Sequence, residues 1–168
     1  MIVKNHDDIR RRTMDDTPQK TADLGVLTGQ LMRAIQEELF ETLAEQGHPA
    51  VRPRHGSVLA FLRPEGVRAT ELSARSGQHK QIVGTIVDEL VKLGYVRREP
   101  DPDDRRAKRI VPTELGLDEI AKARAVLAAI EDRHAQALGV NRFTAFRTTL
   151  QEITNNQRSW RQTAGSQT

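Results

Sequence analysis

The 168-residue sequence contains no cysteine, one tryptophan, one tyrosine and four phenylalanines. The absence of cysteine excludes disulfides, thiolate nucleophiles, the common cysteine zinc cages and redox sensing through cysteine. No stretch approaches the roughly 20 apolar residues of a membrane-spanning helix, and the start of the chain lacks the apolar segment of a secretion signal. We therefore expect a cytoplasmic protein without a membrane segment, built as one domain with tails.

Recognisable catalytic and metal-binding motifs are also missing. The sequence has no nucleophile elbow, no phosphate-binding loop and no Gly-x-Gly-x-x-Gly pattern. Its five histidines show no His-x-x-x-His spacing, which leaves open only a metal site assembled by folding. We therefore expect a protein that is not an enzyme and that uses no cofactor or metal.

Charge is distributed unevenly along the chain. Residues 50–109 contain 13 Lys and Arg against 8 Asp and Glu, whereas the remaining residues contain 13 against 15. A positive centre between mildly acidic flanks suggests that the central segment meets a polyanion such as nucleic acid. Enzymes that never bind nucleic acid can also carry arginine-rich surfaces, so charge alone does not decide the function.

Apolar residues at three- and four-residue spacing predict a mainly α-helical fold. Asp23 and Asn141 are the expected N-caps of the first and last helices, and Gly77 is an expected left-handed C-cap. Two short polar-rich β-strands with a turn between them predict a hairpin. The expected helices span residues 23–46, 54–62, 69–76, 80–93, 113–138 and 141–157, and the expected strands span 95–99 and 108–111.

This order of elements predicts a single domain. Two short helices joined by a glycine-containing turn and followed by a hairpin are typical of a winged helix-turn-helix, expected here over about residues 52–112. The flanking helices, about 23–46 and 113–157, are too apolar for helices outside the central module, which favours dimerisation over an intramolecular core. Residues 1–20 and 158–168 are expected to be a flexible arm and a frayed tail.

The start of the second short helix carries the candidate DNA-reading residues His79, Lys80, Gln81, Gly84 and Thr85. A helix fits the DNA major groove, where side chains near its N-terminus reach base edges. The Gln81 amide matches adenine, the Lys80 ammonium suits guanine or phosphate, and Gly84 permits close backbone approach. The alternative is that these polar residues are only a solvated helix start.

The tip of the hairpin carries a second group of candidate DNA contacts. Asp104 and Arg106 stand two residues apart, so on a strand they share a face and can pair, which would extend the arginine toward a minor groove. Arg105, Lys108 and Arg109 are expected to hold flanking phosphates. The alternative is an exposed salt bridge that contributes only about 0–1 kcal/mol.

On these residues the chain resembles the winged helix-turn-helix of MarR-family transcription regulators. The specific resemblance covers about residues 69–116, and the number and order of helices extend it loosely over 23–157; Pro112 departs from the family pattern, which usually has leucine there. The residues that carry it are Glu71-Leu72 through Gly77, Lys80-Gln81, Val87-Asp88-Glu89-Leu90, Gly94-Tyr95-Val96, Asp101-Pro102-Asp103-Asp104-Arg105-Arg106 and Thr113 through Gly116.

The resemblance implies a homodimer with interlocking terminal helices that binds a pseudo-palindromic operator in double-stranded DNA. It also implies a repressor released by a small aromatic or anionic effector, bound between the dimerisation helices and the DNA-binding lobe. His48, Arg52, His55 and Arg63 are the candidate effector ligands near that boundary, although such residues beside helix ends are usually structural. The alternative function is a winged-helix protein-interaction module without specific DNA binding.

Overall fold

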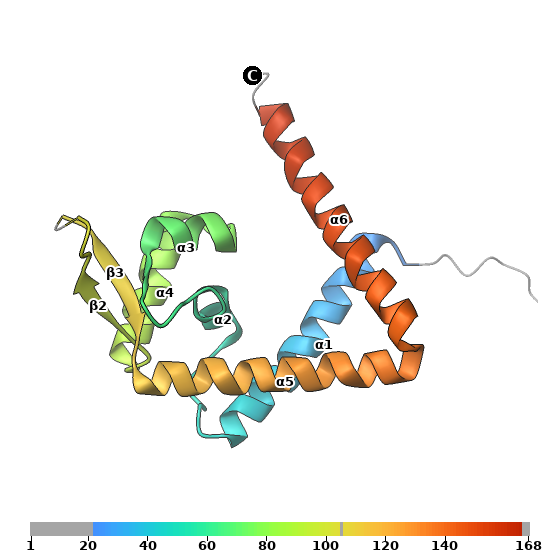
Figure 1. Cartoon of the computed structure of the whole chain (residues 1–168), viewed down its shortest axis with the longest axis horizontal. Coiled ribbons are helices and arrows are strands. Elements are labelled where there is room, and N and C mark those ends of the chain that lie inside the picture. The colour runs from blue at the N-terminus through green and yellow to red at the C-terminus, as the bar shows by residue number, and fades with distance from the viewer. Residues whose placement is uncertain (1–21, 105, 166–168) are drawn as a thin grey trace, which may run out of the picture.

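The computed structural model describes residues 22–104 and 106–165, which form helices and one small sheet. A winged lobe, built from residues 51–112, lies at one end of the long helix α5, α6 leaves from the other end, and α1 crosses α5 near its middle (Figure 1). The predicted mainly α fold with a winged helix-turn-helix is therefore confirmed. The elements are α1 (Leu24–Glu45), α2 (Pro53–Leu59), β1 (Val67–Arg68), α3 (Ala69–Ser76), α4 (Lys80–Lys92), β2 (Val96–Pro100), β3 (Lys108–Pro112), α5 (Glu114–Leu138) and α6 (Val140–Gly165).

Two of the three predicted helix caps are confirmed. The Asp23 side chain accepts a hydrogen bond from the backbone of Val26, and Gly77 adopts the left-handed conformation with φ of 69°. The prediction that Asn141 caps the last helix is wrong, because α6 begins at Val140 directly after Gly139, whose positive φ of 87° separates the two long helices. Helix α6 also continues to Gly165, past the expected end at residue 157.

The sheet has three antiparallel strands in the order β1-β3-β2, one more than the expected hairpin. The additional strand is the two-residue β1, which pairs Val67 with Ile110 of β3. The predicted hairpin itself is present, with Arg98 opposite Ile110 and Pro100 opposite Lys108. The short strand joins the wing to the start of α3, so the wing is held to the helix-turn-helix by backbone hydrogen bonds.

The hydrophobic core lies inside the winged lobe. Its centre is formed by Leu59, Leu72, Val83 and Leu90, each at most 2% exposed, and Ile120 of α5 closes it from below. The first turn of α5 packs closely against this core, because a Cβ on Gly116 would lie 2.1 Å from the Tyr95 carbonyl oxygen. This contact anchors one end of the long helix to the lobe.

Candidate nucleic-acid interface

Helix α4 places the candidate DNA-reading residues on one exposed surface of the lobe. Its amphipathic pattern buries Val83, Ile86, Val87 and Leu90 in the core, which leaves the opposite face free. On that face His79, Lys80, Gln81 and Thr85 are exposed, and a side chain at the half-buried Gly84 would meet no atom within 4 Å. The polar side chains on the first two turns of α4 are therefore not covered by any other described part of the chain.

Ile82 is a residue of this surface that the sequence analysis missed. It lies among the polar side chains at the start of α4 and is 45% exposed, which is unusual for isoleucine beside a complete core. An apolar side chain in the major groove can contact the methyl group of thymine. The interruption of the polar run His79 to Gln81 by an isoleucine was the available signal.

The tip of the wing differs from the expected geometry. Asp104 and Arg106 lie in the turn rather than on a strand, and within the described part of the wing their side chains form no ion pair. Instead, the Asp104 carboxylate accepts the backbone N–H of Arg106 at 3.0 Å, which shapes the turn and leaves the arginine side chain exposed. Lys108 is exposed at the start of β3, and Arg105 lies outside the described residues.

The base of the wing contains a buried carboxylate that sequence reasoning treated only as a turn former. Asp101 has a fully buried side chain, and its Oδ2 accepts hydrogen bonds from Arg68 Nε at 2.7 Å and Arg109 Nε at 3.1 Å. These arginines hold the pKa of Asp101 well below its usual range, with Arg68 as the main cause. Arg109 is therefore engaged inside the wing through Nε, and the phosphate contact expected for it stays a prediction.

Asp101 consequently fixes the direction of the wing. Arg68 belongs to β1 and precedes α3, whereas Arg109 belongs to β3. A carboxylate that bridges the two strands holds the hairpin in a defined orientation relative to the helix-turn-helix. The exposed arginine and lysine side chains of the wing therefore keep a fixed position relative to α4.

The two candidate effector histidines are structural instead. His48 is 1% exposed, with Nε2 3.0 Å from Asp118 and Nδ1 3.2 Å from the Tyr95 hydroxyl. His55 is equally buried, and its Nε2 lies 3.0 Å from Glu89. Both rings therefore join helices within the lobe and α5, and the effector role expected for them is not supported by their positions.

The two candidate effector arginines have partners within the chain. Arg52 donates to the carbonyl oxygen of Pro49 at 3.0 Å, and Arg63 pairs with Glu71 at 3.1 Å. Neither residue lines either of the two cavities described below. The effector role expected for Arg52 and Arg63 therefore stays a prediction that these contacts do not support.

A cavity of about 740 Å³ lies between α1, α2 and α5, at the junction of the lobe and the long helices. Its wall is mostly apolar, with a few polar groups, an arrangement typical of small-molecule sites. The residues that line it are Met32, Ile35, Gln36, Leu39, Phe40, Pro53, Arg54, Gly56, Ser57, Leu59, Ala60, Gln78, Glu119, Ile120, Ala123, Arg124 and Leu127.

Glu119 is the unusual member of this cavity. Its side chain is 2% exposed, and the Oε2 atom is fully buried with no hydrogen-bond partner in the described part of the chain. Burial raises the pKa of Glu119 to about 7. Glu119 was not among the residues expected to bind a ligand, because no local pattern in the sequence sets it apart from the exposed carboxylates around it.

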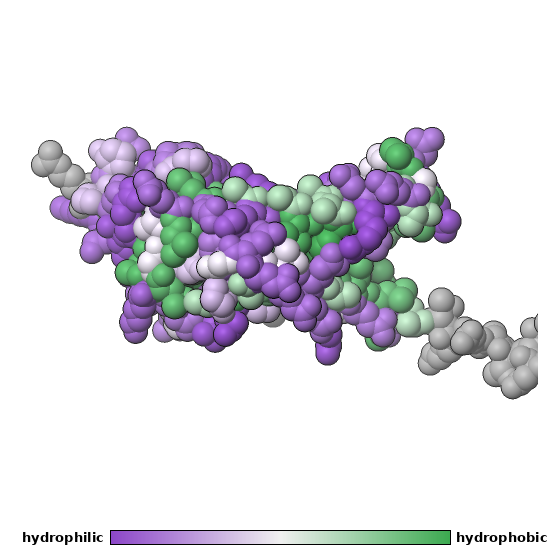
Figure 2. All heavy atoms as spheres, turned by 90° about the horizontal axis from the view of Figure 1, so that it is seen from below, coloured by the Kyte–Doolittle hydropathy of each residue, from purple (hydrophilic) through white to green (hydrophobic). Residues whose placement is uncertain are grey.

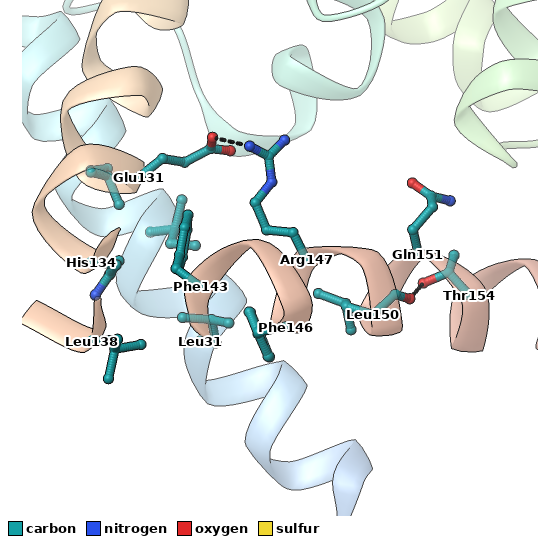
Figure 3. Close-up of a pocket in the computed structure, with 12 residues that line it drawn as sticks. Leu31, Glu131, His134, Leu138, Phe143, Phe146, Arg147, Leu150, Gln151 and Thr154 are labelled. Carbon is teal, nitrogen blue, oxygen red and sulfur yellow. Dashed lines mark hydrogen bonds and ion pairs between the residues drawn. The ribbon is translucent and has the colours of Figure 1, made fainter. Parts of the chain in front are cut away.

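The helices outside the lobe leave much apolar surface uncovered. Hydrophobic atoms gather over the half of the molecule that contains α1, α5 and α6 (Figure 2). A second cavity of about 470 Å³ opens there, and Figure 3 shows Leu31, Leu138, Phe143 and Phe146 converging on it from the three helices. The Arg147–Glu131 ion pair of 2.8 Å lies at its edge.

Among the described residues, no group of three or more His, Asp or Glu side chains could hold a metal ion. In the same part of the chain, no helix combines the length and the hydropathy that crossing a membrane requires.

A protein-family model described as the MarR family matches residues 51–107, which include α2 to β2 and the wing tip. A curated relative from Bacillus subtilis (strain 168), the uncharacterized HTH-type transcriptional regulator YcgE, is 50% identical over 44 residues, or 26% of this chain. The matched part spans only 29% of that curated relative.

Solved structures match over most of the chain. CouR from Rhodococcus jostii RHA1, bound to p-coumaroyl-CoA, is 31% identical, with 78% of this chain and 91% of that chain covered and a TM-score of 0.64. A structure of CouR bound to a 23-mer DNA duplex matches at 26% identity, with 79% and 92% covered and a TM-score of 0.65. A MarR-family transcriptional regulator from Rhodococcus sp. RHA1 is 30% identical, with 78% and 91% covered and a TM-score of 0.63.

Proposed function

Because this chain belongs to the MarR family of transcription regulators, we propose that it is a dimeric repressor that binds a pseudo-palindromic DNA site and is released by a small molecule. The observation that carries the proposal is the exposed polar face of α4 beside an oriented, arginine-bearing wing. The relative CouR, which matches over this same lobe, has been solved on a DNA duplex. We assign the protein no catalytic role and place it in the cytoplasm with its DNA.

DNA contacts follow from the geometry of the lobe. Helix α4 enters a major groove, where Gln81 reads adenine, Lys80 contacts guanine or phosphate, and Thr85 and His79 reach the groove edges. Gly84 and Ile82 allow close approach and a contact with thymine methyl groups. In the wing, the exposed Arg106 reaches the adjacent minor groove, and Arg105 and Lys108 contact phosphates.

Dimerisation follows from the uncovered apolar faces of α1, α5 and α6. Monomeric soluble proteins rarely expose large contiguous apolar patches. A second copy of the chain covers Leu31, Phe146 and Ile153, each of which is more than a third exposed in the single chain. Two-fold symmetry then places two α4 helices about one turn of DNA apart, roughly 34–36 Å.

Release requires a ligand that favours a different separation of the two lobes. The cavity between α1, α2 and α5 lies where a ligand can contact both the lobe and the dimerisation helices. CouR has been solved with p-coumaroyl-CoA, an aromatic acyl thioester with a polyanionic end. We assign the same ligand class to this cavity, with Arg54 and Arg124 facing the anionic part.

The proposal is tested by footprinting the purified protein on the DNA upstream of its own coding region. We expect two protected half-sites, loss of protection when p-coumaroyl-CoA is added, and a salt dependence whose log-log slope changes by about −0.9 for each phosphate contact. Equal affinity for this DNA and for random duplex at physiological salt would overturn the proposal in favour of a protein-interaction module.

A further inference from the structure

Glu119 has no function inside the folded chain that accounts for its burial. Buried polar groups in proteins are nearly always hydrogen-bonded, because water otherwise solvates them better. Oε2 of Glu119 is the exception here among the described buried side chains. Glu119 is one of the residues that line the cavity between α1, α2 and α5, so a ligand in that cavity lies beside this residue.

The neighbouring hydrogen-bond donors are already committed elsewhere. His48 Nε2 faces the Asp118 carboxylate at 3.0 Å, so in the neutral ring this nitrogen carries the proton and Nδ1 is the acceptor. The Tyr95 hydroxyl, 3.2 Å from Nδ1, therefore donates its proton to His48. Tyr95 has no second proton to give to Glu119.

The charged groups of the cavity lie at different depths. Glu119 is buried, whereas Arg54 and Arg124 are exposed. Arg54 is paired with Glu89 at 2.8 Å, and among the described residues Arg124 forms no ion pair. An occupant with an anionic group toward the arginines, an apolar body and a hydrogen-bond donor at the buried end satisfies all of these groups at once.

We propose that Glu119 is the specificity-determining residue of the effector cavity and accepts a hydrogen bond from a hydroxyl group on the aromatic end of the ligand. This inference rests on the effector cavity of the proposed function. A hydroxyl is favoured over a cationic amine because Arg54 and Arg124 at the exposed end repel a positively charged ligand. Both the neutral and the ionised carboxyl group can accept such a bond, so the recognition does not depend on the protonation state.

The test uses two matched pairs of probes on the full-length dimer. The first pair is p-coumaroyl-CoA and cinnamoyl-CoA, which differ only by the hydroxyl group, and the second pair is the corresponding free acids. Calorimetric titration of the wild type is expected to show at least tenfold tighter binding of the hydroxylated member, because a site built to pair with a hydroxyl rejects the analogue that lacks it.

Two variants separate recognition from folding. Glu119→Leu removes the acceptor and is expected to reduce the preference to less than threefold, by weakening the hydroxylated ligand and strengthening the other. Glu119→Gln keeps a carbonyl acceptor and is expected to retain most of the preference. Asp118→Asn is the matched control, because it removes the adjacent carboxylate that faces His48 and Lys122 and does not line the cavity.

The outcomes distinguish the two proposals. If wild type and Glu119→Leu bind both members of a pair equally, the role of Glu119 is overturned while the effector cavity stands. If only the free acids bind, the assignment of a thioester ligand is overturned. The role of Glu119 is then decided by whether wild type prefers the hydroxylated acid and Glu119→Leu does not. If no probe binds the wild type, both the effector class and the role of Glu119 are overturned.

Discussion

The winged lobe and the long helices around it are built in opposite ways. In the lobe, apolar side chains from α2, α3, α4 and the sheet meet in one core, and the polar face of α4 points outward. In α6, Phe146 and Ile153 are exposed, and apart from Ile120, which closes the lobe core, the long helices bury only Leu43 and Ile130 among their large hydrophobic residues. The lobe is thus complete in one chain, whereas the long helices leave apolar surface uncovered, which the proposed second copy covers.

The winged lobe and the long helices are therefore expected to have different functions. A lobe with its own core can keep α4 and the wing in a fixed mutual arrangement, with Asp101 as the link between strands. The long helices determine how far apart two lobes lie. The cavity with Glu119 lies between the regions, where a ligand can act on their relative position.

The largest effect is expected from a charged residue on the uncovered apolar face of α1, α5 and α6. Phe146→Asp places an aspartate where Figure 3 shows the aromatic side chain converging with Leu31 and Leu138. An unpaired buried charge costs about 3–5 kcal/mol, here on each subunit, so we expect a folded monomer with little operator affinity. Sedimentation velocity at micromolar concentration measures this. Thr148→Asp, on the opposite side of α6, is the control and should remain dimeric; a dimeric Phe146→Asp would remove this face from the interface.

The next test concerns the core of the lobe. Leu90→Ala removes a fully buried side chain and is expected to lower the free energy of unfolding by about 2–5 kcal/mol. The adjacent Val91 is 37% exposed, so Val91→Ala should change it by less than about 0.5 kcal/mol. Urea denaturation compares the two variants. Similar costs at the two positions would show that the lobe does not have the separate core described here.

A smaller effect is expected at the wing. Arg106→Ala should weaken binding to the operator by about 1–3 kcal/mol while the dimer and the free energy of unfolding stay unchanged, because the side chain is exposed. Arg142→Ala on α6 removes the same charge far from the lobe and serves as the control in fluorescence anisotropy. If the two variants bind DNA equally well, the wing arginine has no minor-groove role.

The last test concerns the pH dependence of stability at the junction of the two regions. The pKa of Glu119 is about 7 in the folded chain against an ordinary 4.5, so its contribution to stability is full below pH 4.5 and is lost as pH rises through 7. Glu119→Gln has no such loss, and its unfolding free energy relative to wild type should rise between pH 4.5 and about pH 8. Asp118→Asn should show no rise in this window, because the pKa of Asp118 is lowered, mainly by Lys122. A flat difference for Glu119→Gln would mean that the carboxyl group is solvated.

Local patterns predicted much of the fold, because helix stripes, caps and turn residues are encoded by neighbours in the chain. The Asp23 cap and the hairpin are examples. The strand β1 was missed because two residues carry no periodic pattern. Asn141 was preferred as a cap for its residue type, whereas the positive φ of Gly139 already begins the last helix.

The site was harder to predict, because its members meet across long separations. His55 bonds to Glu89 and His48 to Asp118, and nothing near either histidine in the sequence indicates these partners. The exposed residues of α4 were predictable, since they follow from the apolar stripe of the same helix. Glu119 was not, because it becomes buried only when the start of α5 packs across the lobe.

The proposed dimer is tested most directly by the DNA sequence that it selects. Purified protein is incubated with a library of randomised duplexes at physiological salt, and the bound sequences are read after several rounds. We expect a pseudo-palindrome whose half-sites are centred about 10–10.5 base pairs apart, with A·T-rich flanks where the wings lie. Recovery of a single half-site, or no enrichment at all, would contradict a two-fold pair of lobes that reads one duplex.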